Sequence, residues 1–158
     1  MSGRLLGSTW AAVAFVLDQG SKALALGSPS LAAGTEVLPV FNLVLIRNDG
    51  VSFGMLSGLA PRWTLVLLAL TVVVWLSVWL WRSQSRQVSV ALGLIIGGAL
   101  GNVADRIRFH AVTDFLDFHL GTYHWPAFNL ADVAVVSGVA MLAWNSFRDT
   151  KETSSAKT

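Results

Sequence analysis

Four stretches of this sequence are long and apolar enough to cross a lipid bilayer. The clearest covers residues 63–81 and contains no charged residue, and the others cover 5–26, 88–104 and 127–147. A helix needs about 20 mostly apolar residues to cross the roughly 30 Å hydrocarbon core. Only helices and closed barrels satisfy their backbone polar groups there. We therefore expect an all-α membrane protein with four transmembrane helices.

The composition of the 158 residues argues against a soluble enzyme. Hydrophobic residues make up 54% of the chain and charged residues 13%, whereas a soluble domain carries about 25% charged residues. The absence of cysteine excludes a disulfide framework, a thiolate metal site and a cysteine nucleophile. The net charge of +2 is spread along the chain without a basic patch, so no nucleic-acid partner is expected.

The positions of lysine and arginine predict the orientation of the chain, because basic residues are enriched on the cytoplasmic side. Six lie on the side of the termini and four on the other: Arg4, Arg82, Arg86, Arg148, Lys151 and Lys157 against Arg47, Arg62, Arg106 and Arg108. Both termini are therefore predicted to be cytoplasmic. Residues 1–148 form a single membrane domain in this interpretation, and the hydrophilic residues 149–158 form a disordered cytoplasmic tail.

The two connections on the outer side look structured. Residues 37–46 form a strand-like run, and the Asn48-Asp49-Gly50 turn signal follows it, which predicts a small β element. Residues 107–126 combine five aromatic side chains with His and Asp. This mixture is typical of a segment at the boundary between water and lipid, so an interfacial segment is predicted there.

Ionisable residues inside a membrane span cost at least a few kcal/mol each, so each needs a partner or a function. Asp18 and Lys22 lie four residues apart in the first span and can meet on one helix face. One interpretation is a self-neutralising pair near the outer end of the span. Membership of a functional site is the other explanation, and the two residues alone do not decide between them.

Polar residues from separate parts of the sequence converge at one depth. An Asn is followed three residues later by an Asp at the outer end of the third span and again at the outer start of the fourth, so each pair shares a helix face. The groups at this depth are Asp18, Asn48, Asn102 with Asp105, Asp114, and Asn129 with Asp132. Helix capping explains Asn129 but not Asp132, about 8 Å below the start of its span. The pattern indicates a functional site just beneath the outer surface.

Small residues predict close packing of the third and fourth spans. Glycine recurs every four residues in the third span, and the fourth carries a similar stripe. These residues are Gly93, Gly97 and Gly101, and Ala127, Ala131, Ala134 and Gly138. Such packing would bring the polar ends of the two spans together.

The residue types available at this depth favour carboxylate chemistry. The sequence contains no G-x-S-x-G and no H-E-x-x-H, and the spacing of His110, His119 and His124 fits no standard metal-ligand set. No metal or other cofactor is therefore predicted. Two aspartates in a desolvated site can share one proton, so that one activates water while the other hydrogen-bonds a scissile carbonyl. Intramembrane carboxylates also carry protons in transporters, and that alternative stays open on this evidence.

Five segments in order resemble the motifs of the lipoprotein signal peptidases, also called signal peptidase II. These are bacterial inner-membrane aspartyl proteases that cleave prolipoproteins just before a lipid-modified cysteine. The similar segments are residues 18–22 (DQGSK), 47–54 (RNDGVSFG), 97–106 (GGALGNVADR), 112–115 (VTDF) and 128–132 (FNLAD). The third is the most specific of them, and together they extend over nearly the whole chain.

The resemblance implies that Asp114 and Asp132 form the catalytic pair. The residues implied to support them or bind substrate are Asp18, Lys22, Asn48, Gly50, Asn102, Asp105, Arg106 and Asn129. It also implies four transmembrane helices with a small extracytoplasmic β-cradle and an interfacial segment, and an active site near the outer leaflet. The implied partners are a diacylglyceryl-modified prolipoprotein and membrane lipid, and we expect a monomer.

The main alternative is a small proton-coupled membrane transporter with a relay through Asp18, Asp114 and Asp132. Transport requires access from both sides, whereas the polar groups stop near the outer ends of the spans. A third hypothesis is a membrane scaffold without catalysis, for which removal of Asp114 would affect only stability.

Overall fold

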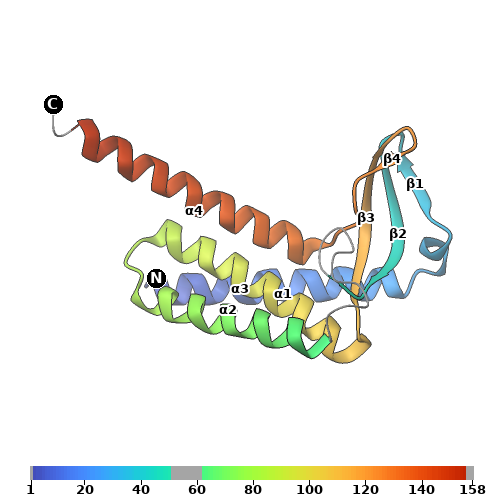
Figure 1. Ribbon diagram of the computed structural model, residues 1–158, viewed down its shortest axis with the longest axis horizontal. Helices are drawn as coiled ribbons and strands as arrows, with labels where there is room; N and C mark the ends of the chain where they lie inside the picture. Colours follow the sequence, from blue (N-terminus) through green and yellow to red (C-terminus); the bar gives the residue numbers. More distant parts are fainter. Residues whose placement is uncertain (1, 51–61, 156–158) are drawn as a thin grey trace.

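The computed structural model describes residues 2–50 and 62–155, with side chains through residue 148. Its elements are α1 (Gly3–Leu26), η1 (Pro29–Ala32), β1 (Thr35–Leu38), β2 (Phe41–Asn48), α2 (Arg62–Arg82), α3 (Arg86–Phe109), β3 (Val112–Leu120), β4 (Tyr123–His124) and α4 (Leu130–Ser155). The long helices lie side by side, and the sheet stands at one end of them (Figure 1). Residues 51–54 of the second motif lie outside the described residues.

Three helices in the described ranges are long and apolar enough to cross a membrane. They are α2, α3 and the part of α4 that runs from Leu130 to Arg148. The stretch predicted as the first span is helix α1, whose 24 residues would suffice in length. Asp18 and Lys22 lower the hydropathy of its second half. A fourth transmembrane helix therefore stays a prediction.

Helix α3 is the centre of the bundle and packs against α1, α2 and α4. The predicted contact between α3 and α4 is confirmed, because Gly98 lies directly against the backbone of Ala131. The stripe formed by Gly93, Gly97 and Gly101 instead faces α1, where Gly97 meets Ala11 and Ala14. Glycine is needed at these positions because a methyl group would overlap the facing backbone or side chain.

An apolar core joins α2 to α3, while much of the remaining apolar surface points outward. The core side chains are Val73, Leu76, Leu80, Leu92, Ile95 and Ile96. On α2, Leu67, Val74 and Trp75 are each more than 60% exposed. Outward-facing apolar residues on this scale suit a helix surrounded by lipid.

The four strands form one antiparallel sheet in the order β1-β2-β3-β4. The β element predicted near residues 37–46 is confirmed, although a turn at Pro39 and Val40 divides it into β1 and β2. Residues 112–120 of the predicted interfacial segment form strand β3, which is paired with β2 from Phe41↔Phe118 to Asn48↔Val112. This strand was not predicted from the sequence, and the location of the segment at the membrane boundary stays a prediction. Its β-branched and aromatic side chains suit a strand, and pairing satisfies the edge of β2.

Helix α4 is longer than the sequence predicted at its C-terminal end. The predicted fourth span ends at residue 147, whereas the helix continues to Ser155, into the segment predicted to be a disordered tail. No glycine or proline follows Gly138, so nothing in the local sequence stops the helix.

Gly101 offers a test of this packing, because a Cβ there would collide with the carboxylate of Asp18. We predict that Gly101→Ala lowers the free energy of unfolding by about 1–3 kcal/mol, as overpacking of a tight interface does. Thermal unfolding in detergent measures the effect. Gly20→Ala is the matched control, since its added methyl group meets nothing within 4 Å and should leave stability equal or higher. Equal melting temperatures for both variants would contradict the prediction.

Candidate active site

The first turn of α4 holds Asp132 in place through a capping box. The side-chain Oδ1 of Asn129 accepts a hydrogen bond from the backbone N–H of Asp132 at 3.1 Å, and Asp132 Oδ2 accepts from the N–H of Asn129 at 3.3 Å. These reciprocal bonds satisfy two N–H groups that the helix itself cannot pair. Capping therefore accounts for one oxygen of Asp132 as well as for Asn129, and it leaves Oδ1 available for another partner.

Asp114 approaches the same place from strand β3. The chain reverses after α3 at His110, whose left-handed conformation (φ 68°) directs β3 back along the helix end. Asp114 is 2% exposed. Its Oδ2 accepts from the side-chain amide of Asn48 at 3.1 Å, and its Oδ1 accepts from that of Asn129 at 2.7 Å. Strand pairing between β2 and β3 places Asn48 beside it.

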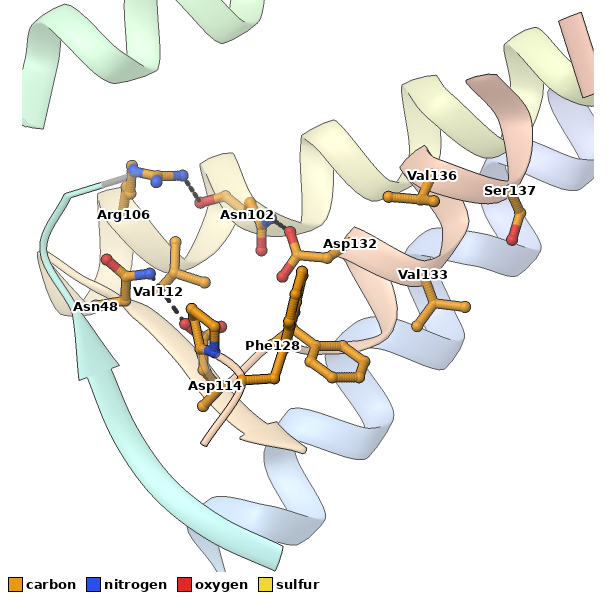
Figure 2. A pocket seen from close by; sticks show the side chains of 13 residues that line it. Asn48, Asn102, Arg106, Val112, Asp114, Phe128, Asp132, Val133, Val136 and Ser137 are labelled. Atoms are coloured by element: carbon orange, nitrogen blue, oxygen red, sulfur yellow. Dashed lines mark hydrogen bonds between the residues drawn. The ribbon is translucent and has the colours of Figure 1, made fainter. Parts of the chain in front are cut away.

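Two asparagines link the carboxylates. Asn129 contacts both, because its side chain donates to Asp114 while its backbone N–H donates to Asp132. Asn102 on α3 donates from Nδ2 to Asp132 Oδ1 at 2.9 Å, and its own Oδ1 accepts from Asn129 Nδ2 at 3.2 Å. Figure 2 shows Asp114 and Asp132 on facing walls of one pocket, with Asn48 and Asn102 beside them.

A buried ion cluster supports this arrangement from behind. The ammonium of Lys22 lies 2.9 Å from Asp18 Oδ2, 3.4 Å from Asp105 Oδ2 and 2.9 Å from Asn102 Oδ1. Lys22, Asp18 and Asp105 are at most 2% exposed. The predicted Asp18–Lys22 pair is therefore confirmed. Lys22 also contacts Asp105 and Asn102 on α3, and Asn102 in turn hydrogen-bonds Asp132. A self-neutralising pair is only part of the role of Lys22.

The two carboxylates of the cluster tie it to other elements. Asp18 Oδ1 accepts the backbone N–H of Ala131 in α4 at 2.9 Å. Asp105 Oδ2 accepts the N–H of Thr113, the residue before Asp114, at 2.8 Å. Ala131 precedes Asp132 and Thr113 precedes Asp114 in the sequence. The buried ion cluster therefore holds the backbone beside each of the two carboxylates.

Arg106 joins the second motif to the third. Its Nη2 donates to the carbonyl of Gly50 at 2.8 Å, and its Nη1 donates to the carbonyl of Asn102 at 3.4 Å. The N–H of Gly50 in turn donates to Asn48 Oδ1 at 3.1 Å, which orients the amide that contacts Asp114. All ten residues that the sequence singled out are thus connected in one region.

Residue-level reasoning from the sequence missed two members of this network. Gln19 donates from Nε2 to Asp18, to the carbonyl of Gly101 and to Asp105, at 3.1 to 3.2 Å. Thr113 accepts from Arg47 at 2.8 Å through its hydroxyl. Gln19 lies inside the first motif beside Asp18, and that position was the available signal. Thr113 likewise lies inside the fourth motif, beside Asp114, and that position was its only signal.

The two carboxylates line a cavity of about 580 Å3. Its walls are polar near the sheet and apolar along α4 (Figure 2). The lining residues are Asn48, Asn102, Arg106, Val112, Asp114, Trp125, Pro126, Ala127, Phe128, Asp132, Val133, Val136 and Ser137. Apolar walls with a few converging polar groups are typical of a binding site.

Burial raises the pKa of Asp114 from 3.8 to about 6, and the negative charge of Asp132 acts in the same direction. The hydrogen bonds from Asn48 and Asn129 oppose this shift by favouring the ionised form. A raised pKa at a cleft is typical of a functional acid. Two carboxylates in such a site can hold one proton between them, take a proton from water and return one to a leaving group.

The histidines lie apart from this chemistry. His119 and His124 stack on each other, with ring centroids 4.9 Å apart, and His124 contacts Asp117 at 2.9 Å. Within residues 2–50 and 62–148, no group of three or more His, Asp or Glu side chains is arranged to hold a metal ion.

The chain is similar to known proteins over most of its length. The model of the family described as signal peptidase (SPase) II matches residues 10–148. A lipoprotein signal peptidase from Beijerinckia indica subsp. indica is 44% identical, over 93% of this chain and 90% of the relative. One from Methylocella silvestris is 40% identical, over 92% of this chain and 88% of the relative.

A solved structure described as a bacterial membrane enzyme has the same fold. It superposes with a TM-score of 0.83 at 27% identity, over 92% of this chain and 90% of that one. A second bacterial membrane enzyme superposes with a TM-score of 0.79 at 26% identity. The family match covers both carboxylates, their asparagine partners and the buried ion cluster. The chain belongs to the signal peptidase (SPase) II family.

Proposed function

We propose that the protein is an aspartic endopeptidase of the bacterial membrane that removes the signal peptide from diacylglyceryl-modified prolipoproteins, cleaving before the lipidated cysteine. Membership of the signal peptidase II family and relatives named lipoprotein signal peptidases support the protease activity and the lipoprotein substrate. The observation that carries the aspartic mechanism is the pairing of Asp114 and Asp132 across one cavity, both hydrogen-bonded by Asn129.

The reaction begins with one proton shared by the two carboxylates. The ionised aspartate takes a proton from a water molecule, which attacks the scissile carbonyl while the protonated aspartate hydrogen-bonds the carbonyl oxygen. Collapse of the tetrahedral intermediate breaks the C–N bond, and a carboxyl proton passes to the leaving amine. Asn48, Asn102 and Asn129 hold the carboxylates in position during both steps, which keeps the reacting groups aligned.

The supporting residues act by positioning. Asp18, Lys22 and Asp105 hold α1 and α3 against the backbones of Ala131 and Thr113, the neighbours of the two acids. Arg106 holds the backbone of Gly50 just after β2, and Gly50 in turn orients the side chain of Asn48. In this proposal they orient the catalytic pair and the substrate without reacting themselves.

The membrane arrangement in this proposal includes α1 as a fourth transmembrane helix. Burial of Asp18 and Lys22 against α3 removes their charges from lipid, so the other face of α1, with Val16 and Leu17 about 60% exposed, can contact hydrocarbon. α1 begins and α4 ends at the end of the helices opposite the sheet (Figure 1). With both termini cytoplasmic, the β-cradle and active site lie near the outer leaflet, and the monomer works without metal or cofactor.

The transporter alternative is not supported, because the matched relatives are named as peptidases. The scaffold hypothesis remains distinguishable by experiment, since it predicts that the carboxylates matter only for stability.

Removal of either carboxylate should abolish cleavage. We predict that Asp114→Asn and Asp132→Asn each lower kcat at least about 1000-fold on a purified diacylglyceryl-prolipoprotein in detergent, because an amide can neither accept nor return the proton. Asp117→Asn is the matched control: this buried aspartate lies on the same strand but contacts Asn42 and His124 outside the cavity. It should keep cleavage within about threefold, and activity retained by either dyad variant would refute the mechanism.

The raised pKa of Asp114 predicts a pH-dependent stability. The folded protein binds this proton more tightly than the unfolded chain, so ionisation of Asp114 destabilises the fold as the pH rises from about 4 to about 6, with no further change above. The difference between a pKa of 3.8 and one of about 6 corresponds to about 3 kcal/mol. Asp114→Asn cannot ionise, so its melting temperature relative to wild type should be higher at about pH 8 than at about pH 5. A difference independent of pH would contradict the assigned pKa.

A further inference from the structure

The cavity extends past the catalytic pair along one face of α4. Val133, Val136 and Ser137 line this extension, and Figure 2 places Ser137 farther along the helix from Asp114 than Val133. All three belong to the part of α4 that is long and apolar enough to cross a membrane. Ser137 is thus an exposed polar side chain on an otherwise apolar and open stretch of wall, which faces hydrocarbon in the proposed membrane arrangement.

The hydroxyl of Ser137 differs from other hydroxyls in the apolar helices. Thr71 and Ser77 on α2 and Ser89 on α3 each donate to the carbonyl four residues earlier, at 2.7 to 2.8 Å. Ser137 makes no such bond with any residue that the structure describes. A hydroxyl without a partner in apolar surroundings costs free energy, and a bound ligand can satisfy it.

A substrate peptide needs a partner at this depth. Cleavage requires the peptide groups near the scissile bond to leave the helical conformation, which frees N–H and C=O groups that hydrocarbon cannot satisfy. Ser137 follows Asp132 by five residues, a rise of about 8 Å along the helix. An extended peptide covers that distance with about two residues. The signal peptide is the membrane-embedded part of the substrate, so the residues before the scissile bond reach this depth.

We infer that Ser137 is a positioning residue whose hydroxyl hydrogen-bonds the substrate backbone about two residues before the scissile bond. This inference rests on the proposed function. It assigns a polar contact to the apolar end of the cavity, where Val133 and Val136 bind the signal-peptide side chains by packing. The contact sets the register of the peptide relative to Asp114 and Asp132.

Replacement of the hydroxyl tests the contact. We predict that Ser137→Ala lowers kcat/KM about three- to tenfold, the value of one neutral hydrogen bond. Ser137→Thr keeps the hydroxyl and should restore at least half of the wild-type value. Ser77→Ala is the matched control, because it removes a hydroxyl that bonds within its own helix at Val73, and its kcat/KM should match wild type.

A substrate with one ester linkage distinguishes a direct contact from a change in packing. An ester at the peptide link two residues before the scissile bond removes the N–H and weakens the carbonyl acceptor. Wild type should lose about three- to tenfold in kcat/KM on this substrate, whereas Ser137→Ala should lose less than twofold. An equal loss in both enzymes, or unchanged cleavage by Ser137→Ala, would overturn the inference. Failure of the wild type to cleave any prolipoprotein would instead overturn the proposed function.

Discussion

The rest of the structure depends on the ion pairs that the ammonium group of Lys22 makes with Asp18 and Asp105. A lysine 2% exposed beside apolar helices must be neutralised, and Asp18 and Asp105 provide that charge at 2.9 and 3.4 Å. Because these acids lie on different helices, the cluster fixes the depth of α1 against α3. Asp18 also holds the N–H of Ala131, so the start of α4 is set by the same charge. Loss of the ammonium would leave buried carboxylates without compensation, which is costly in a low-dielectric interior.

Two asparagine side chains connect this cluster to the carboxylates of Asp114 and Asp132. Asn102 Oδ1 accepts from both Lys22 and Asn129, so its Nδ2 has to face Asp132. Asn129 is constrained in the same way, because its Oδ1 caps α4 and its Nδ2 therefore points at Asp114. A side-chain amide can exchange the positions of its oxygen and nitrogen only when both positions can hydrogen-bond equally well to the neighbouring groups. In Asn102 and Asn129 the oxygen contacts only donors and the nitrogen contacts only acceptors. Both side chains are therefore ordered before any ligand binds.

The sequence predicted the parts of this site that depend on local spacing. The i, i+4 pairing of Asp18 with Lys22 was correct because helix geometry alone decides it. The N–H of Thr113 could not be assigned to Asp105, since that bond depends on how far the chain travels after α3 before it turns into β3. The strand character of residues 112–120 was missed for a similar reason: their aromatic residues suit an interface as well as a sheet. Among contacts between distant segments, the packing of α3 against α4 was predictable from their small residues. The individual hydrogen bonds of the site were not predictable from local spacing.

Asp132 contributes both to the start of α4 and to the polar lining of the cavity. One of its oxygens completes the cap of α4 and the other accepts from Asn102, so both are used before any water or peptide arrives. The helix cap prevents the carboxylate from turning away, and the carboxylate in turn defines where the helix begins. A substitution that preserved the cap but not the acid would keep the fold. One that shifted the helix start by a single residue would rotate the acid out of the cavity by about 100°, given 3.6 residues per turn. The position of Asp132 relative to Asp114 is therefore set by the first turn of a helix, and variation in the remainder of α4 can alter the apolar wall of the cavity without moving the two carboxylates.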